Sequence, residues 1–306
     1  MPLPKLPDGA SVYGRPIFLD PAPGPGSRPL AGGPLHFSGL DLTFVGPDRA
    51  VLARTRATLD RLADAVTPHL PTVLAQTLDR TMAALTASRP PLPLPDGPLT
   101  LDNRVRIMGV VNVTPDSFSD GGEHATAQAA IAHGLALASA GADILDIGGE
   151  STRPGAEPVA LDEERRRVLP VIEGLRGCGV PLSVDTRRAA VMREAAELGV
   201  SLINDVSGLC HDPDAVATAV DLGLPVCIMH AQGTPQTMQQ KPSYDHVLFD
   251  IVDWLAGRLA AWRDAGGDPA RLVLDPGIGF GKTVRHNLDL INGLGLMHGL
   301  GCPLLL

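Results

Sequence analysis

Polar residues suited to ligand binding follow several apolar stretches of this chain. Asn112, Asp185 and Asp275 each end such a stretch, and Asn204 lies near the end of another. Carboxylate and amide groups can together bind a flat heterocycle that carries amino and lactam groups. A buried carboxylate facing a 2-amino N–H edge makes a charge-assisted contact. Recognition of such a heterocycle is the first chemistry that the sequence indicates.

A second set of residues suits an anion. Residues 148–155 (GGESTRPG) combine the Thr152 hydroxyl, the Arg153 guanidinium and glycine-rich backbone, which suit a phosphate. A surface arginine in a turn explains this motif equally well when it is taken alone. Asn112 can give one oxygen to a hard cation that arrives bound to a phosphate. The sequence has no HExxH motif or Cys/His cluster, which argues against a tightly held zinc.

Residues 275–283 (DPGIGFGKT) resemble a nucleotide-binding P-loop, but Pro276 stands where its first glycine is required. We interpret the segment as a loop whose glycines let the backbone approach a flat ligand. Phe280 is then available to pack on that ligand, and Lys282 adds positive charge. For His230, a packed structural role is favoured over a base or a metal ligand.

The elements that must position these residues are short apolar strands alternating with helix-length segments. We predict strands at 107–113, 144–149, 182–186, 202–206, 226–230, 272–276 and 303–306, and helices at about 125–140, 162–176, 188–198, 213–222, 245–265 and 285–296. This alternation is typical of a parallel sheet covered by helices. Seven strands in regular order favour an α/β fold of the (β/α)8 TIM-barrel type over a doubly wound sheet.

A barrel also explains why polar residues follow the strands, since catalytic groups of such barrels lie at the carboxyl ends. A single Asp or Asn there is more often a turn former or a helix cap, and Asp205 and Asp212 fit that description. Residues from five or six separate strands converge on one mouth, however. The pattern as a whole therefore favours an active site.

The amino-terminal third has a different pattern. Residues 1–35 are rich in Pro and Gly without periodicity, and residues 40–45 can form one strand. From 48 to 88 the apolar spacing is helical and is broken by Pro68 and Pro71, which predicts a helical hairpin. We expect a mainly helical extension.

We place this extension at residues 1–100, with a Pro-rich linker near 89–98, and the barrel domain at 101–306. The chain stops inside the seventh predicted strand, at Leu306. A closed barrel needs about 50–60 further residues at the usual size of a βα unit. We therefore expect a truncated sequence.

Composition limits the function classes. A net charge of −9 argues against non-specific nucleic-acid binding, and no apolar run is long enough to span a membrane. The amino terminus lacks the apolar core of a secretory signal. Cys178, Cys210, Cys227 and Cys302 form no CxxC pair, which indicates free thiols in a reducing cytoplasm.

At these segments the chain resembles the dihydropteroate synthases. The matches, in the family's order, are 108–122 (MGVVNVTPDSFSDGG), 146–156 (DIGGESTRPGA), 183–186 (SVDT), 203–206 (INDV), 229–233 (MHAQG) and 274–282 (LDPGIGFGK). The first two are long and specific. The resemblance implies a TIM-barrel transferase of folate biosynthesis. Such an enzyme joins p-aminobenzoate to the pyrophosphate ester of 6-hydroxymethyl-7,8-dihydropterin and releases pyrophosphate with Mg²⁺.

The resemblance also implies site residues. Pterin contacts would come from Asp185, Asn204, Val206, Met229, Asp275, Gly279 and Phe280. The loops around p-aminobenzoate would include Thr114, Pro115, Asp116, Ser117, Phe118, Thr152 and Pro154. The metal and pyrophosphate would meet Asn112, and the catalytic set would be Asn112, Thr152, Arg153 and Asp185.

The residues fit that chemistry. The amine of p-aminobenzoate is a weak nucleophile that needs little deprotonation, so catalysis should come mainly from stabilising the departing pyrophosphate and a cationic pterin. Asp185 can stabilise that cation. Closure of loops 113–122 and 150–156 would exclude water.

Two family segments, a Ser-Arg-Lys that contacts the pterin and an Arg-x-His that binds the anion, would fall beyond Leu306. We therefore expect this polypeptide to be poorly active, and measurable pyrophosphate release would contradict that expectation. The resemblance further implies a homodimer in the full-length form.

Two alternatives remain open. A methyltetrahydrofolate-binding methyltransferase uses similar Asp and Asn residues, but the loops at 114–120 and 151–155 argue against it. A non-catalytic pterin-binding protein would need neither Asn112 nor Arg153. A p-aminobenzoate-dependent assay separates the first from a synthase, and calorimetry with pyrophosphate separates the second.

Overall fold

Six of the predicted strands form one parallel sheet in the computed structural model, which describes residues 4–101, 104–113, 123–151 and 155–306. They are β6 (Met108–Asn112), β7 (Ile144–Gly148), β8 (Leu182–Asp185), β9 (Leu202–Asp205), β10 (Val226–Met229) and β11 (Leu272–Asp275). Their order is β11-β10-β9-β8-β7-β6, so each strand pairs with its neighbours in sequence. In a doubly wound sheet, the order of the strands reverses at one point. The unbroken order is that of consecutive barrel strands, which confirms the predicted fold class.

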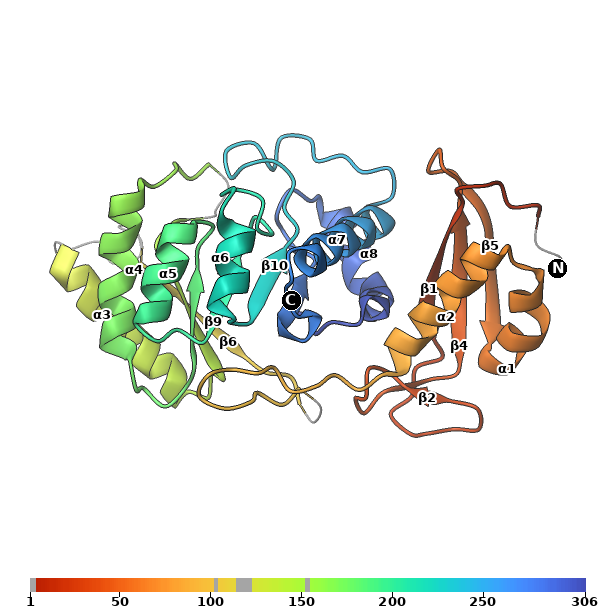
Figure 1. The fold of residues 1–306 in the computed structure, drawn as a ribbon, viewed down its shortest axis with the longest axis horizontal. Coiled ribbons are helices and arrows are strands. Elements are labelled where there is room, and N and C mark those ends of the chain that lie inside the picture. Colours follow the sequence, from red (N-terminus) through yellow and green to blue (C-terminus); the bar gives the residue numbers. More distant parts are fainter. Residues whose placement is uncertain (1–3, 102–103, 114–122, 152–154) are drawn as a thin grey trace. The chain divides into compact units, whose positions relative to one another are not determined.

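Helices follow these strands as the sequence predicts. They are α3 (Glu123–Ser139), α4 (Leu161–Leu175), α5 (Ala189–Glu197), α6 (Ala215–Leu222), α7 (Val247–Asp264) and α8 (Val284–Gly293), with short 3-10 helices η4 (Pro269–Arg271) and η5 (Leu294–Leu300). In Figure 1, α3, α4, α5 and α6 lie side by side along the sheet. The apolar face of α4 is buried at Val168, Val171 and Ile172, because every third or fourth residue of a helix lies on one face.

The prediction of a seventh strand at 303–306 is wrong. This segment is not part of the six-stranded sheet. The backbone N–H of Leu305 donates to the carbonyl of Leu274 at 3.0 Å, so the segment runs beside β11. A strand requires a ladder of successive bonds. The apolar run Pro303–Leu306 makes one such bond to a described strand.

The Pro-rich stretch after residue 88 has a structural role. Leu92 and Leu94 are 2% and 6% exposed and pack against Ile144, Leu202 and Val273, which lie at the starts of their strands. The backbones of Leu92 and Leu99 pair as an antiparallel bridge. This turn therefore covers apolar side chains at the amino ends of the parallel strands.

The prediction of a mainly helical extension is wrong. The amino-terminal region contains an antiparallel sheet of β1 (Ser11–Ile17), β4 (Gly39–Val45) and β5 (Val51–Thr58), in the order β1-β4-β5. A short pair, β2 (Arg28–Pro29) and β3 (His36–Phe37), precedes β4. The helical elements are α1 (Leu59–Arg61), the single-turn η1 (Leu62–Val66) and η2 (Thr67–His69), and α2 (Thr72–Thr86).

The error has a physical cause in β5. Leu52, Leu59 and Leu62 have helical spacing, but Ala53, Thr55 and Ala57 alternate with exposed residues and face the sheet interior. Small residues give a weak period-2 signal. Pairing with β4, which buries Leu40, Leu42 and Phe44 completely, decides the conformation. The second half of the predicted hairpin is confirmed as α2, which buries Leu74, Leu78 and Leu85.

The described chain divides into two compact units (Figure 1). The first, which we call the amino-terminal unit, comprises residues 1–90 together with 243–256 and 284–304. The second, the barrel unit, comprises 91–242, 257–283 and 305–306. The first unit thus takes segments from distant parts of the sequence, among them α8 and the start of α7.

Candidate active site

The strand register puts the predicted ligand-binding residues on one face of the parallel sheet. Asn112 is level with Gly148, which is level with Asp185, which is level with Asn204. Asn204 is level with Cys227, and Met229, two residues on, is level with Asp275. Residues in register, or two apart on one strand, point to the same face. This face therefore carries Asn112, Asp185, Asn204, Met229 and Asp275.

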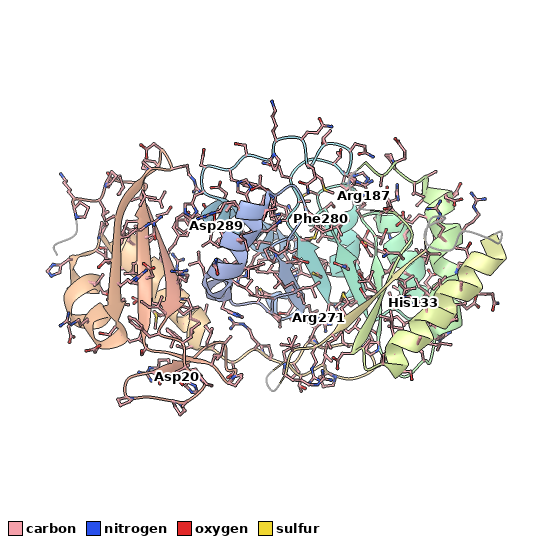
Figure 2. The ribbon with its side chains drawn as sticks, turned by 180° about the vertical axis from the view of Figure 1, so that it is seen from behind. Asp20, His133, Arg187, Arg271, Phe280 and Asp289 are labelled. Carbon is pink, nitrogen blue, oxygen red and sulfur yellow. The ribbon has the colours of Figure 1, made fainter. Side chains whose placement is uncertain are left out.

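Figure 2 shows at which end these residues gather. Arg187 and Phe280, which follow β8 and β11, lie toward one end of the parallel sheet. Arg271, which precedes β11, lies toward the other. The polar residues at positions 112, 185 and 275 each end their strands, so they belong to the carboxyl end, where barrels build their sites.

Asp185 lies over Gly148 of the neighbouring strand. A Cβ atom added to that glycine would be 3.1 Å from Asp185 Oδ2, so the carboxylate occupies space that a side chain would fill. Burial raises the pKa of Asp185 well above its usual value, and the charges of Asp146 and Asp205 raise it further. The raised pKa favours the protonated form, and a cationic ligand would shift the group back toward the carboxylate.

Asn204 has a buried partner below the rim of the site. Its Nδ2 donates to Asp146 Oδ2 at 2.8 Å, and the two residues are 8% and 4% exposed. Asp146 belongs to the middle of β7, and burial raises the pKa of its carboxyl group, against the hydrogen bond from Asn204. The bond crosses β8 and links the first and third of three adjacent strands.

Asp275 sits at the start of a tightly turned loop. Its Oδ1 accepts from the backbone N–H of Gly277 at 2.6 Å. Burial raises the pKa of Asp275 to about 6, while the Gly277 bond and the charge of Lys282 act in the opposite direction. Gly277 has φ +67°, and a Cβ there would be 1.9 Å from the carbonyl oxygen of His230. The glycine is required both by its backbone conformation and by this close approach.

Lys282 is buried, at 3% exposure, and holds this loop from inside. Its Nζ donates to the carbonyl of Phe280 at 2.9 Å and lies 3.1 Å from His230 Nδ1 and 3.2 Å from the His230 carbonyl. Burial lowers the pKa of Lys282 to about 7, against the charge of Asp275. His230 thus packs against the loop after β11, as the structural interpretation predicts.

Glu150 ties together the two ends of the loop that follows β7. Both of its oxygens accept from Arg187, at 2.8 and 2.9 Å, and Oε1 also accepts from the backbone of Val159 at 3.1 Å. Glu150 and Arg187 side chains are 11% and 17% exposed. Such a bidentate pair is both strong and directional. It fixes the base of segment 151–158 to the end of β8.

Three loops at the carboxyl end are joined by hydrogen bonds to backbone carbonyls. The Gly155 N–H donates to the Pro235 carbonyl at 2.9 Å, and Gln236 Nε2 donates to the Ala156 carbonyl. Gln239 Nε2 in turn donates to the Gly279 carbonyl at 2.5 Å. Segment 231–242 therefore connects the loop after β7 with the loop after β11.

Comparison with known proteins shows which family this chain resembles. Residues 108–306 match the model of the "Pterin binding enzyme" family. The Escherichia coli K12 dihydropteroate synthase is 46% identical over 200 residues, which cover 65% of this chain and 71% of that protein. The Neisseria meningitidis serogroup C synthase is 49% identical over 210 residues, covering 67% and 73%.

Solved structures agree. The Xanthomonas albilineans dihydropteroate synthase with 4-aminobenzoic acid superimposes with a TM-score of 0.66 at 49% identity, covering 71% of this chain and 77% of that one. The same enzyme in complex with 7,8-dihydropteroate gives 0.60 at 48% identity, covering 67% and 72%. The chain belongs to the dihydropteroate synthase family.

Several of the predicted dihydropteroate synthase site residues lie outside the described part of the chain. These are Thr114, Pro115, Asp116, Ser117, Phe118, Thr152, Arg153 and Pro154. Of the remainder, Met229 is 4% exposed, whereas Val206 and Phe280 are half-buried. Gly279 has φ +89°, a conformation that glycine adopts without strain.

Of two acidic residues that the sequence allowed as turn formers or caps, Asp205 stabilises a turn and Asp212 caps a helix. Asp205 Oδ1 accepts from the backbone and hydroxyl of Ser207, at 2.7 and 2.6 Å, and its side chain points to the opposite face from Asn204. Asp212 accepts from the first backbone N–H of α5, at Ala189, at 2.9 Å. Neither belongs to the dihydropteroate synthase site proper.

Sequence reasoning missed Asp146 and understated Lys282. The signal for Asp146 was present, because a carboxyl group in the middle of the apolar run Ile144–Ile147 is unusual in a buried strand. For Lys282 the sequence suggested only added charge. Its contacts with His230 and Phe280 depend on two loops from different strands, which no local pattern reveals.

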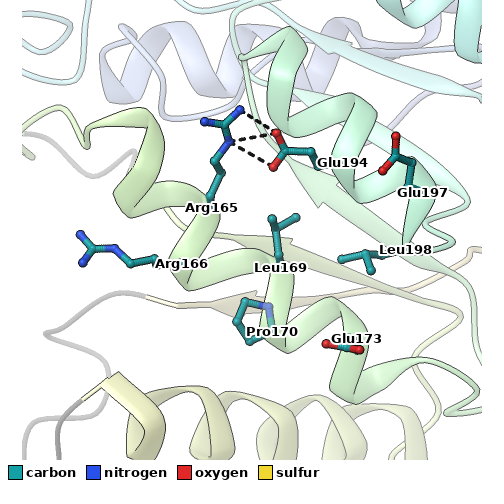
Figure 3. A pocket seen from close by; sticks show the side chains of 8 residues that line it. All are labelled: Arg165, Arg166, Leu169, Pro170, Glu173, Glu194, Glu197 and Leu198. Carbon is teal, nitrogen blue, oxygen red and sulfur yellow. Dashed lines mark hydrogen bonds and ion pairs between the residues drawn. The ribbon is translucent and has the colours of Figure 1, made fainter.

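A groove on the outer surface lies apart from these strand ends. It has a volume of about 470 Å³ and runs between α4 and α5, where Arg165 is paired with Glu194 (Figure 3). Leu169, Pro170 and Leu198 form its apolar part. Since it is built from helices and not from strand ends, it is separate from the dihydropteroate synthase site.

Proposed function

We propose that this chain catalyses the dihydropteroate synthase reaction. p-Aminobenzoate would attack the exocyclic CH₂ of 6-hydroxymethyl-7,8-dihydropterin pyrophosphate, forming a C–N bond as the C–O bond to pyrophosphate breaks. The observation that carries the proposal is the set of acceptors Asp185, Asn204 and Asp275 on one face of the sheet, at its carboxyl end. Such a set suits the N–H-rich edge of a pterin.

Each pterin contact has a part in this proposal. Asp185, Asn204 and Asp275 would hold the polar edge of the ring. Met229, which is level with Asp275, would support its flat face together with Val206, Gly279 and Phe280. A slot of this kind fixes the ring and brings the reacting CH₂ to a defined position.

Rate enhancement would come mainly from electrostatics. In its charged form, the buried carboxylate of Asp185 would present a fixed negative charge to the ligand. As the C–O bond breaks, positive charge develops on the dihydropterin. Negative groups that are already in place stabilise that charge without reorganisation.

The pyrophosphate would lie against Thr152 and Arg153, whose loop is anchored by Glu150. Closure of loops 113–122 and 150–156 would then complete the p-aminobenzoate site with Thr114–Phe118 and Pro154 and would keep water from the cation.

The proposal includes Mg²⁺. Within residues 4–101, 104–113, 123–151 and 155–306, no group of three or more His, Cys, Asp or Glu surrounds a common metal position. The exposed amide of Asn112 offers one neutral oxygen, which suits an ion held mainly by phosphate oxygens and water. When bound, Mg²⁺ would neutralise charge on the leaving pyrophosphate.

We also propose a cytoplasmic location and a homodimer as the full-length form. The support for the first is that Cys178, Cys210, Cys227 and Cys302 are all free thiols. No helix in the described part of the chain is long and apolar enough to cross a membrane. The homodimer rests on the family resemblance alone.

The test is p-aminobenzoate-dependent release of pyrophosphate by the purified protein, together with calorimetric binding of the dihydropterin. Binding with release supports the synthase. Binding of pterin without any response to pyrophosphate would instead support a non-catalytic pterin-binding protein. If methyltetrahydrofolate bound and p-aminobenzoate had no effect, a methyltransferase would replace the proposal.

A further inference from the structure

The bond between Asp146 and Asn204 determines which end of the Asn204 amide faces the site. An asparagine amide has two ends, an oxygen that accepts hydrogen bonds and an NH₂ group that donates them. A ligand therefore meets opposite chemistry depending on which way the amide is turned. Most asparagines at a binding site can adopt either orientation unless a second group holds them.

Asp146 is such a second group. Asn204 Nδ2 lies 2.8 Å from Asp146 Oδ2, and the oxygen of a carboxylate accepts but does not donate. The amide must therefore turn its NH₂ toward Asp146 and its Oδ1 away. The charged carboxylate fixes this orientation, because a proton on Oδ2 would let Asp146 donate to the oxygen of a turned amide instead.

Burial makes this constraint strong. Asp146 is 4% exposed and is enclosed in the strand interior, and its Oδ1 has no hydrogen-bond partner among the described residues. Rotating the Asn204 amide would bring its oxygen against a buried carboxylate oxygen. Two acceptors in contact away from water are costly, because neither lone pair is satisfied.

The neighbours of Asn204 give the orientation its consequence. Asp185 is level with Asn204 on the adjacent strand, and Asp185 also presents acceptor oxygens on the same face. With its Oδ1 turned away from Asp146, Asn204 extends this row of acceptors. A heterocycle with two neighbouring N–H groups would satisfy both residues, whereas one with a ring lone pair at the second position would not.

We propose that Asp146 is a positioning residue that fixes the Asn204 amide with its oxygen toward the ligand, so that the site selects an N–H donor at that position. The inference rests on the proposed function, because it takes a pterin as the ligand. It assigns to a residue below the site a share of the specificity that would otherwise be attributed to Asn204 alone.

Calorimetric titration with 6-hydroxymethyl-7,8-dihydropterin tests the proposal. Asp146→Leu removes the acceptor and leaves the amide without a fixed orientation, and we expect the Kd to rise about tenfold, the equivalent of one lost hydrogen bond. Asp146→Asn is isosteric and keeps a hydrogen bond to Asn204, but it lets either end of the Asn204 amide face the ligand. We expect its Kd to rise too, by about two- to threefold.

Asp205→Asn is the matched control. Asp205 is also a buried strand carboxyl, but it points to the other face and bonds to Ser207. It should lose thermal stability and keep the original Kd. All titrations are run below the lowest melting temperature of the set, measured by circular dichroism.

The outcomes are distinct. An unchanged Kd in folded Asp146→Leu would overturn the proposal, and so would an unchanged Kd in Asp146→Asn. If Asp146→Leu does not fold, Asp146→Asn decides. Failure of the unaltered protein to bind the dihydropterin would contradict the proposed function itself.

Discussion

At the scale of single residues, the site depends on carboxyl groups kept out of water. Asp185 and Asp275 lie on one face with raised pKa values, and Asp205 lies on the other, its pKa also raised, to about 6. Burial is the largest cause in each case, since it disfavours the charged form. In the proposed function, Asp275 accepts from the dihydropterin in its charged form. Affinity is therefore expected to depend on pH in a range where an exposed carboxylate would not titrate.

The first prediction concerns Asp275. Since its pKa is about 6, lowering the pH through that value protonates the carboxyl and should weaken dihydropterin binding, by about tenfold one unit below. Calorimetry between about pH 5 and about pH 8 measures this. Asp275→Asn should bind weakly and lose that part of the pH dependence, whereas Asp205→Asn should retain it. A flat profile in the unaltered protein would show that Asp275 does not contact the ligand.

The raised pKa of Asp275 affects folding stability in the opposite direction from ligand binding: acid favours the folded state. The folded state raises the pKa of Asp275 from 3.8 to about 6 and so binds this proton more tightly than the unfolded chain. The group's contribution to the unfolding free energy is fully present below the unfolded value and is lost as the pH rises through about 6. Urea unfolding of the unaltered protein and of Asp275→Asn across that range checks the sign.

At the scale of elements, the loops at the carboxyl ends are held by specific close contacts. The loop after β11 approaches His230 through Gly277 and is fixed from inside by Lys282. The loop after β7 is fastened at its base by Glu150. Loops held at their ends in this way can carry side chains at defined positions.

We predict that Gly277→Ala is severely destabilising. The new Cβ would lie 1.9 Å from a backbone oxygen, and backbone atoms cannot move aside as a flexible side chain can. Gly266→Ala is the matched control, because Gly266 also has a positive φ, +87°, but has nothing within 4 Å of the added atom. Gly266→Ala should cost about 1 kcal/mol and Gly277→Ala at least about 2 kcal/mol more, by chemical unfolding. Equal losses would mean that the loop adapts.

Glu150→Ala tests the fastening of the other loop. It leaves Arg187 and the Val159 N–H without their partner, and we expect a loss of about 2 kcal/mol and a raised KM for the pterin pyrophosphate. Asp162→Ala removes an exposed ion pair with Arg165 on α4 and should cost less than about 1 kcal/mol with KM unchanged. If both variants behaved alike, Glu150 would have only a general electrostatic effect.

At the scale of the whole molecule, the amino-terminal unit is built from distant segments. Tyr13 of β1 stacks on Phe249 of α7 with ring centroids 4.2 Å apart, and its hydroxyl donates to Asp253 at 2.7 Å. Arg49 forms ion pairs with Asp250 and Asp253. Residues 1–90 therefore cover side chains that belong to a helix far along the sequence.

A fragment that begins at Pro91 should consequently be unstable. It would lack the partners of Phe249 and of the 284–304 segment, and would expose apolar surface that the intact chain buries. We expect a lower melting temperature and binding of a hydrophobic dye, compared with the 306-residue protein. Tyr13→Ala in the intact chain should shift the melting temperature in the same direction by less. A fragment as stable as the whole chain would contradict this role.

Much of the barrel followed from local pattern, and the amino-terminal region did not. The strand at 226–230 was found because Val226–Met229 is a continuous apolar run bounded by turn residues. β5 was missed because Val51–Thr58 has few apolar residues and becomes a strand through pairing with β4. The short apolar run at 303–306 shows the opposite error, since apolar composition alone does not supply a ladder of hydrogen bonds.

The sequence by itself determined the fold class, the order of strands and helices in the barrel unit, and which polar residues end its strands, because these depend on periodicity and on residues close in the chain. Tertiary structure alone decided that Asp146 meets Asn204 across 58 positions, and that Lys282 meets His230 across 52. It likewise decided that Asp205 and Asn204, adjacent in sequence, have different roles. The physical reason is that register and burial are set by neighbouring strands, and they fix both the face of a side chain and its proton affinity.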